Sequence, residues 1–441
     1  MFICIYKSGR IVYCDSAVFL YHFSLPKCFA FSPSTNQPTF KAKFNIYGVC
    51  HLQSVIMNKT HLKDYFLLDP EFTFLNHGSF GATPKPVFDV YQQFQRELEH
   101  QPVHFIQKRL PDLLAESRHA LGAYLAVHGD NLIYTPNPTA GVNMVVKSLD
   151  LGPGDEVLTT DIEYGACDNC LDFYAGKKGY RVVRQTVTLP AQSADSLLDE
   201  IWSGVTPNTK VIFISHITSA TAMRLPAEEL CHRARAAGII TIIDGAHAPA
   251  HIELDLSSFD PDFYVGACHK WMCAPKGTAF LYARPDQQPM LEPLVVGWGY
   301  GAKPNPDFGS TFLNIGSWLG TRDLAAYYTI PAAIAFQKEH NWDSVRDGCT
   351  ELLNDTLARI DRLTGMLSMY PAIAPPNQLG IAKMRSGTDP LVLKDFLFDR
   401  KIEIPTTTHQ NDTFVRVSVQ GYNDQEDYDR LLAALGEWQS Q

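Results

Sequence analysis

From about residue 130 onward, short apolar segments alternate with segments of helical pattern. The apolar segments are EVLTT (156–160), RVVRQTVTL (181–189), KVIFISHI (210–217), IITIID (239–244), DFYVGA (262–267) and TAFLYA (278–283). Several are almost continuously apolar, as expected for strands of a sheet that helices cover on both faces. Between two of them, residues 225–238 predict one helix, with Pro226 in its first turn and Gly238 at its end. This alternation predicts βαβ units and an α/β fold with a mainly parallel sheet.

The two ends of the chain have different patterns. Residues 340–365 and 390–400 have helical patterns, FVRVSVQ (414–420) alternates like a strand, and residues 426–438 close with a helix. These elements predict a smaller α+β domain at the C-terminal end. Residues 1–56 are rich in aromatic residues and cysteine without a clear period, and we predict an N-terminal extension outside the fold.

The composition excludes some classes of protein. Of the 441 residues, 45% are hydrophobic and 19% are charged, which is typical of a globular protein. The net charge is −10 and no Lys/Arg-rich run occurs, so nucleic acid is not the expected partner. No segment is long and apolar enough to suggest a membrane span.

The ten cysteines are irregularly spaced, which predicts reduced thiols and a cytoplasmic location. Cys167 and Cys170 have CxxC spacing, but no second pair follows at the separation of a zinc ribbon. Cys268, His269 and Cys273 could suggest metal ligands. Because they have no distant partner motif, ordinary side chains are the favoured interpretation and no metal site is predicted.

Three features together suggest a cofactor site. Asp244 ends a strand and is followed by a glycine turn, at the sheet edge where α/β proteins bind ligands. Thr139 and Ala140 in NPTAGVN fall at a helix start, which suits a phosphate. Lys270 follows DFYVGA, where a partly desolvated amine could attack a carbonyl. Separately these are a turn aspartate, an ordinary helix start and a solvated lysine, but together they match pyridoxal phosphate, which needs a lysine, a carboxylate and a phosphate cradle.

The motifs resemble the class V aminotransferase family of pyridoxal-phosphate fold type I, within it the isopenicillin N epimerase-like group. The resemblance runs from FLNHGSFGATP (74–84) to RVSVQGYN (416–423) and includes NPTAGVN, DIEYGA, SHITSATA, DGAH, HKW and GT. It implies a large domain with a mostly parallel seven-stranded sheet and a small C-terminal α+β domain. The implied boundaries are an N-terminal segment lining the active site (57–84), a large domain binding pyridoxal phosphate (85–325) and a small domain (326–441).

The resemblance also implies roles for the cofactor residues. Lys270 would form the Schiff base and Asp244 would pair with the pyridine nitrogen. Tyr164 would stack on the ring, while His247 and Ser219 would lie near the ring edge and its phenolic oxygen. The phosphate would be held by Thr139 and Ala140, by His269, and by Thr321 from a neighbouring subunit, which implies a homodimer with shared active sites.

For the substrate, the resemblance implies that Arg416 binds the α-carboxylate of an amino acid, since a guanidinium grips a carboxylate with two hydrogen bonds. The strand alternation by itself leaves the facing of Arg416 undecided. Asn76 and His77 are further candidates for the same cavity. Arg109 is a weaker one, because an arginine on a helix surface is the ordinary case.

The reaction stays open among several classes. Epimerisation, transamination and elimination all start by removing the Cα proton, for which Lys270 is the candidate base. Epimerisation also needs a donor on the opposite face, for which Tyr164, His247 and a partner residue are candidates. Cysteine desulfurases of this superfamily use a cysteine shortly before the carboxylate-binding arginine, and no cysteine occurs between 350 and 416. A carbon–sulfur lyase without that cysteine and a non-catalytic binding protein remain alternatives.

Overall fold

The computed structural model describes residues 2–5, 11–14, 60–301, 306–371, 373 and 375–440. The chain divides into two compact units, Met1–Ile56 and Met57–Gln441. In the first unit, β1 (Phe2–Ile5) pairs antiparallel with β2 (Ile11–Cys14). Most of the predicted extension, residues 1–56, lies outside the described residues.

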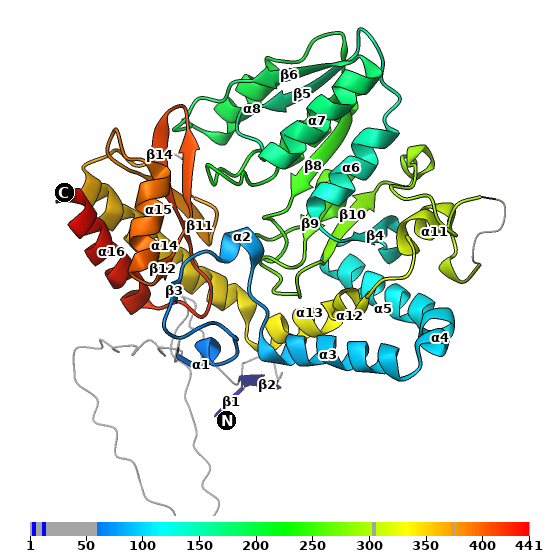
Figure 1. Cartoon of the computed structure of the whole chain (residues 1–441), viewed down its shortest axis with the longest axis horizontal. Helices are drawn as coiled ribbons and strands as arrows, with labels where there is room; N and C mark the ends of the chain where they lie inside the picture. Colours follow the sequence, from blue (N-terminus) through cyan, green and yellow to red (C-terminus); the bar gives the residue numbers. More distant parts are fainter. Residues whose placement is uncertain are drawn as a thin grey trace, which may run out of the picture. The chain divides into compact units, whose positions relative to one another are not determined.

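A seven-stranded sheet forms the centre of the large domain in the second unit (Figure 1). Its strand order is β4-β10-β9-β8-β7-β5-β6, and every neighbouring pair is parallel except those of β10, which runs antiparallel to β4 and β9. The predicted α/β fold is therefore confirmed. The strands are β4 (Leu132–Thr135), β5 (Glu156–Thr160), β6 (Arg181–Gln185), β7 (Thr209–Ser215), β8 (Ile240–Gly245), β9 (Phe263–Ala267) and β10 (Ala279–Ala283).

Two strand predictions need correction. The strand β4, which has only four residues, all buried, was not predicted. The strand β6 was predicted over residues 181–189 but ends at Gln185. Beyond it, the backbone N–H groups of Val187 and Thr188 donate to the side chains of Asp161 and Glu200 at 2.9 and 3.0 Å instead of to a strand.

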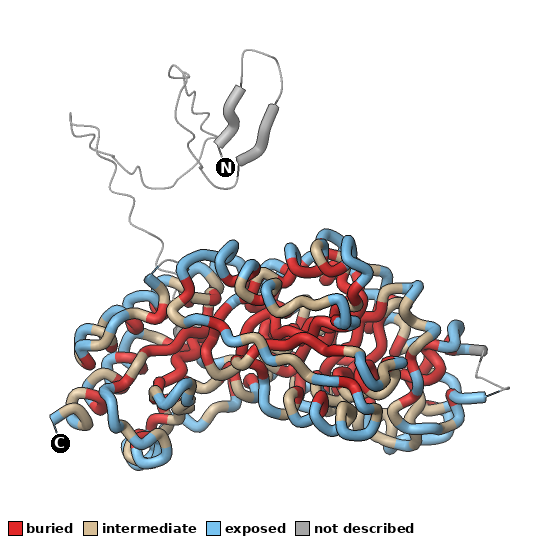
Figure 2. Tube along the Cα trace, turned by 90° about the horizontal axis from the view of Figure 1, so that it is seen from above, coloured by how far each residue is buried: buried red, intermediate tan, exposed pale blue. Residues whose placement is uncertain are grey.

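Helices cover the sheet and the core between the layers is buried (Figure 2). Among them, α6 packs on β8, β9 and β10. A Cβ at Gly141 would lie 2.8 Å from Val265 Cγ1, so glycine lets this helix approach β9 closely. The helix predicted after residue 225 starts one residue later than expected, since Pro226 is its N-cap. The α-helices of this part are α3 (Lys85–His100), α4 (Pro102–His104), α5 (Leu110–Tyr124), α6 (Pro138–Ser148), α7 (Gly165–Lys178), α8 (Ala194–Trp202), α9 (Ala227–Ala236), α10 (Leu256–Phe259), α11 (Thr311–Ser317), α12 (Ala325–Tyr328) and α13 (Ile330–Glu339), with a π-helix at Phe105–Arg109 and 3₁₀ turns at Gly129–Asn131, Gln288–Met290 and Pro306–Phe308.

The C-terminal part contains a three-stranded antiparallel sheet of order β11-β14-β13. This sheet and the helices around it agree with the predicted α+β character of the small domain. The predicted boundary at 325/326 stays a prediction, because residues on both sides of it belong to one compact unit. The elements are α14 (Trp342–Thr364), β11 (Leu379–Lys383), α15 (Pro390–Asp399), β12 (Ile402–Glu403), β13 (Thr406–His409), β14 (Asp412–Ser418) and α16 (Gln425–Gln439).

The segment before α3 contains short elements that contact both the C-terminal part and the loop carrying Lys270. It contains α1 (Thr60–Lys63), β3 (Thr73–Phe74), which pairs with β12, and α2 (His77–Phe80), which lies between the small domain and the large sheet (Figure 1). At Gly81, φ is +68° and a Cβ would lie 1.9 Å from the His269 carbonyl oxygen. The glycine therefore allows this segment to lie directly against the loop that carries Lys270.

Candidate active site

Asp244 lies near the end of one strand, and Lys270 comes shortly after the neighbouring parallel strand. Both residues therefore lie at the same edge of the sheet. Asp244 lies in β8, opposite Val265 of β9, and Lys270 comes three residues after the end of β9. The Asp244 side chain is buried; Oδ1 accepts a hydrogen bond from the Ala246 N–H at 3.0 Å, and Oδ2 accepts one from the Cys167 thiol at 3.4 Å. Burial raises the pKa of Asp244, so the ionised carboxylate gains from a facing cation.

The Lys270 amine lies beside an imidazole. Its Nζ is 2.9 Å from His247 Nε2, and the His247 side chain is buried. Burial, followed by the charge of Arg416, lowers the pKa of Lys270 to about 7. A substantial fraction of the amine is therefore uncharged at neutral pH, and the uncharged form, which is the nucleophile toward a carbonyl, predominates above it.

The residues predicted to hold a phosphate lie on the start of α6 and on the Lys270 loop. Thr139 and Ala140 are in the first turn of α6, and the Ala140 N–H donates to Asn137 Oδ1 at 2.8 Å. The other N–H groups of this turn and the helix dipole suit an anion. His269 Nδ1 lies 2.9 Å from the Thr278 carbonyl oxygen, to which it can only donate, so the ring orientation is fixed.

Tyr164 occupies the N-cap position of α7, and 47% of its surface is exposed. An exposed aromatic ring at a strand-to-helix turn is available for stacking on a flat ligand. This position is compatible with the ring-stacking role that the resemblance implies.

Arg416 is a buried cation in the central strand of the small sheet. It is 4% exposed, so the interpretation as an exposed strand residue does not apply. Its Nη1 donates to the Ser219 carbonyl oxygen and hydroxyl at 2.8 and 3.1 Å, and Nη2 donates to Ser79 Oγ at 2.8 Å. Its Nε has no hydrogen-bond partner, and no carboxylate among the described residues forms an ion pair with its guanidinium. Burial lowers the pKa of Arg416 to about 10, which still leaves it charged at neutral pH.

Asn76 and His77 are connected to the site by hydrogen bonds. Asn76 Oδ1 accepts a hydrogen bond from the Ser79 hydroxyl at 2.5 Å, which links it indirectly to Arg416. His77 is fully buried, with Nε2 3.0 Å from the Lys270 carbonyl oxygen and Nδ1 3.0 Å from the Tyr422 hydroxyl. These contacts favour a role in holding the Lys270 backbone.

Sequence reasoning missed Glu163 and Ser79. Both oxygens of the buried Glu163 carboxyl accept hydrogen bonds, from Thr160 Oγ1 at 2.7 Å and from the Ser215 N–H and hydroxyl at 2.8 and 2.5 Å. Burial raises the pKa of Glu163 to about 7. Ser215 pairs with Asp244 across β7 and β8, so a second buried carboxyl lies behind Asp244. The motif DIEYGA contained this signal, because its glutamate directly precedes Tyr164.

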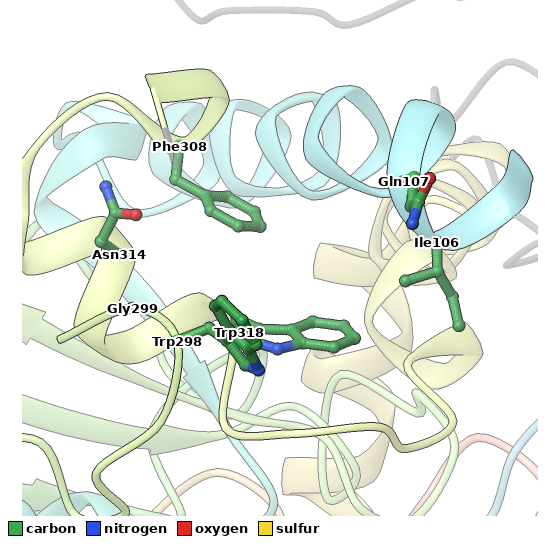
Figure 3. A pocket seen from close by; sticks show the side chains of 7 residues that line it. All are labelled: Ile106, Gln107, Trp298, Gly299, Phe308, Asn314 and Trp318. Carbon is green, nitrogen blue, oxygen red and sulfur yellow. The ribbon is translucent and has the colours of Figure 1, made fainter. Parts of the chain in front are cut away.

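Two predicted residues lie apart from this group. Thr321 is exposed, and none of the hydrogen bonds found among the described residues connects it with Lys270 or Asp244. Arg109 forms an ion pair with Glu97 at 2.5 Å and lies over the Phe105 ring. A separate cavity of about 360 Å³ is lined by Trp298, Trp318 and their neighbours (Figure 3).

The described part of the chain contains neither a cluster of metal ligands nor a helix that could span a membrane. No group of three His, Cys, Asp or Glu side chains there could hold a metal ion. Cys268 and Cys273 are buried, free thiols. In the same residues, no helix has the length and apolar character needed to cross a bilayer.

The arrangement is that of a pyridoxal-phosphate enzyme of fold type I. The chain belongs to the aminotransferase class-V family, whose family model matches residues 74–431. It is 36% identical to the isopenicillin N epimerase of Amycolatopsis lactamdurans, with 84% of this chain and 96% of that protein covered. It is 26% identical to a probable chloroplastic L-cysteine desulfhydrase of Arabidopsis thaliana, with 83% of each covered.

Solved structures confirm the fold. The cystine C–S lyase C-DES, in complex with its reaction product cysteine persulfide, matches with a TM-score of 0.72 at 23% identity. The match covers 83% of this chain and 97% of that one. A cysteine desulfurase of Thermococcus onnurineus matches with the same TM-score at 19% identity. The predicted family, fold and cofactor are thus confirmed, whereas the individual roles of the site residues stay predictions.

Proposed function

We propose that this pyridoxal-phosphate enzyme removes the Cα proton of an amino acid or an amino-acid-containing substrate and epimerises that centre. The observation that carries the substrate class is Arg416, a buried guanidinium without a carboxylate partner among the described residues. Such a charge is costly unless a ligand pairs with it, and an α-carboxylate has the matching planar geometry. Lys270 is close enough for the charge of Arg416 to lower its pKa.

The site residues fit the cofactor. Asp244 offers a buried carboxylate to the pyridinium nitrogen, the start of α6 and His269 offer a phosphate site, and Lys270 offers an uncharged amine. Pyridoxal phosphate, when bound, withdraws electrons from the substrate's Cα and so acidifies its C–H bond.

The chain's own residues then handle the carboxylate and the proton. Arg416, oriented by Ser79 and Ser219, holds the carboxylate so that the Cα–H bond stays within reach of Lys270 Nζ, which takes the proton. Inversion requires a donor on the other face of Cα. Because His247 Nε2 lies 2.9 Å from Lys270 Nζ, the two groups lie side by side, which favours Tyr164 as the opposite donor.

Identity with the two isopenicillin N epimerases, 36% and 34%, supports epimerisation as the first candidate. The cysteine desulfhydrase and C–S lyase similarities support elimination as the second. A desulfurase-type persulfide is disfavoured, because the last cysteine of the chain is Cys349, which is buried in α14.

A panel of L- and D-amino acids and short peptides in deuterated water, followed by proton NMR, tests this proposal. We expect Cα exchange with inversion for at least one substrate, and loss of exchange in Arg416→Met. Pyruvate with ammonia would identify a β-lyase, and a keto acid with aminated cofactor would identify an aminotransferase. Stoichiometric binding without any exchange would contradict catalysis and leave the binding-protein alternative.

We also propose that the enzyme is a cytoplasmic homodimer with shared active sites. Four large apolar side chains in residues 295–300 are exposed, with Trp298 85% exposed, and such patches mark interfaces. The six free, buried cysteines among the described residues agree with a reducing compartment.

Shared sites predict complementation between two defective variants. Lys270→Ala and Thr321→Ala homodimers are expected to be impaired, but a mixed dimer would contain one site with both intact residues. Random reassociation after co-refolding should restore about a quarter of wild-type activity. Sedimentation velocity should show two chains per particle. A monomer, or no gain on mixing, would contradict the shared site.

A further inference from the structure

The indole N–H of Trp271 is directed at His247. Trp271 is completely buried, and its Nε1 lies 3.3 Å from His247 Nδ1. An indole nitrogen can only donate a hydrogen bond. His247 Nδ1 must therefore be the acceptor and carries no proton.

This contact fixes the proton on the other nitrogen of His247. Burial, followed by the charges of Lys270 and Arg416, lowers the pKa of His247 well below its ordinary value, so the ring is neutral. A neutral imidazole carries one proton, which then lies on Nε2. Nε2 is 2.9 Å from Lys270 Nζ, so its N–H donates to the amine lone pair, which only an uncharged amine provides.

A protonated Lys270 would instead place an N–H opposite an N–H. His247 could accept from the ammonium only by moving its proton to Nδ1, which would break the bond from Trp271. Of the other charged and titratable groups that act on this pair, Asp244 and Cys167 favour the ammonium, while Arg416, His251 and His269 disfavour positive charge. The Trp271–His247 contact therefore adds a specific hydrogen-bond requirement to the general effect of burial.

Neighbouring contacts hold both rings in place. The His251 ring stacks on Trp271, with centroids 4.1 Å apart and an interplanar angle of 25°. The Gln378 N–H donates to His251 Nε2 at 3.0 Å, so His251 Nδ1 carries the proton and donates to the His247 carbonyl oxygen at 2.7 Å. Each donor and acceptor in this cluster thus has a single consistent assignment.

We propose that Trp271 is a positioning residue that acts through the tautomer of His247, keeping the Lys270 amine uncharged and oriented for its reaction with the cofactor carbonyl. The inference rests on the proposed role of Lys270. It gives the tryptophan of the HKW motif a function beyond packing.

The test uses the full-length, cofactor-free protein and acetic anhydride as the amine probe, with peptide mass spectrometry to quantify labelling of Lys270 against pH. In the wild type, the labelling rate of Lys270 should rise through about pH 7. The exposed Lys63 serves as the internal reference for labelling in the same digests. In Trp271→Phe, labelling of Lys270 at pH 6 should fall about tenfold, the equivalent of one hydrogen bond. The matched control is Trp342→Phe, because Trp342 is also buried but its indole nitrogen has no partner, and it should leave the profile unchanged.

A second variant tests whether Trp271 acts through His247. It also keeps the inference testable if Trp271→Phe does not fold. His247→Gln should shift the labelling profile in the same direction, and adding Trp271→Phe should shift it no further. Three outcomes would each overturn the inference. They are a Trp271→Phe profile superimposable on that of the wild type, additive shifts in the double variant, and a wild-type labelling rate of Lys270 that does not rise through about pH 7. Uptake of pyridoxal phosphate, followed by its absorbance, reports separately on the proposed function.

Discussion

Lys270→Ala is expected to lose the visible absorbance band of the lysine-bound cofactor and to reduce turnover by at least about 10³-fold. The substitution removes the group that we propose as both the covalent attachment point and the base that takes the Cα proton. Absorbance spectra after addition of pyridoxal phosphate, together with Cα exchange rates, measure the two losses. Lys270→Arg should fail equally, because a guanidinium stays protonated and supplies no nucleophilic amine.

Lys276 is the matched control for this prediction. It lies six residues further along the same loop and is exposed, so Lys276→Ala should retain the absorbance band. If Lys270→Ala kept the band, or if only Lys276→Ala lost it, another lysine would be the attachment site and the enzyme mechanism proposed for Lys270 would fail.

Asp244→Asn is expected to change activity and stability in opposite directions. Turnover should fall by about 10²–10³-fold, because the substitution removes the buried carboxylate that we propose as the partner of the pyridinium nitrogen. The cofactor-free protein, however, should become more stable toward urea at pH 7. Burial raises the pKa of Asp244 in the folded state, so an ionised Asp244 opposes folding above that pKa, and this cost disappears on acidification.

Urea titrations at neutral and acidic pH and turnover measurements check both halves of this prediction. Asp262→Asn is the contrasting variant, because Asp262 is also buried but bonds Thr241 and Arg284 near the start of β9. That variant should lose stability and keep the cofactor spectrum. An Asp244→Asn protein with unchanged turnover would contradict the role of this carboxylate.

Six of the seven strands of the large sheet were predictable, because they are short and largely apolar runs bounded by turn residues. Asp244 and Lys270 could be placed together for the same reason, since the carboxyl ends of adjacent parallel strands lie at one edge. The strand β4 could not be predicted, because four residues are too few to show a hydrophobic period. The alternating pattern of the strand placed Arg416 on the same face as Phe414 and Ser418. The pattern did not show whether that face is buried.

The sequence by itself determined the family and the cofactor, and it predicted the residues that would anchor the cofactor, because these depend on local motifs at strand and helix ends. Only the tertiary structure brought Ser79 and Ser219 to Arg416, and Trp271 to His247. Ser79 and Arg416 are 337 positions apart in the chain, and no local pattern encodes which buried donors and acceptors will meet. Chain folding decides those hydrogen bonds. Through them it influences the protonation state of Lys270 and leaves the Arg416 guanidinium available to bind a substrate carboxylate.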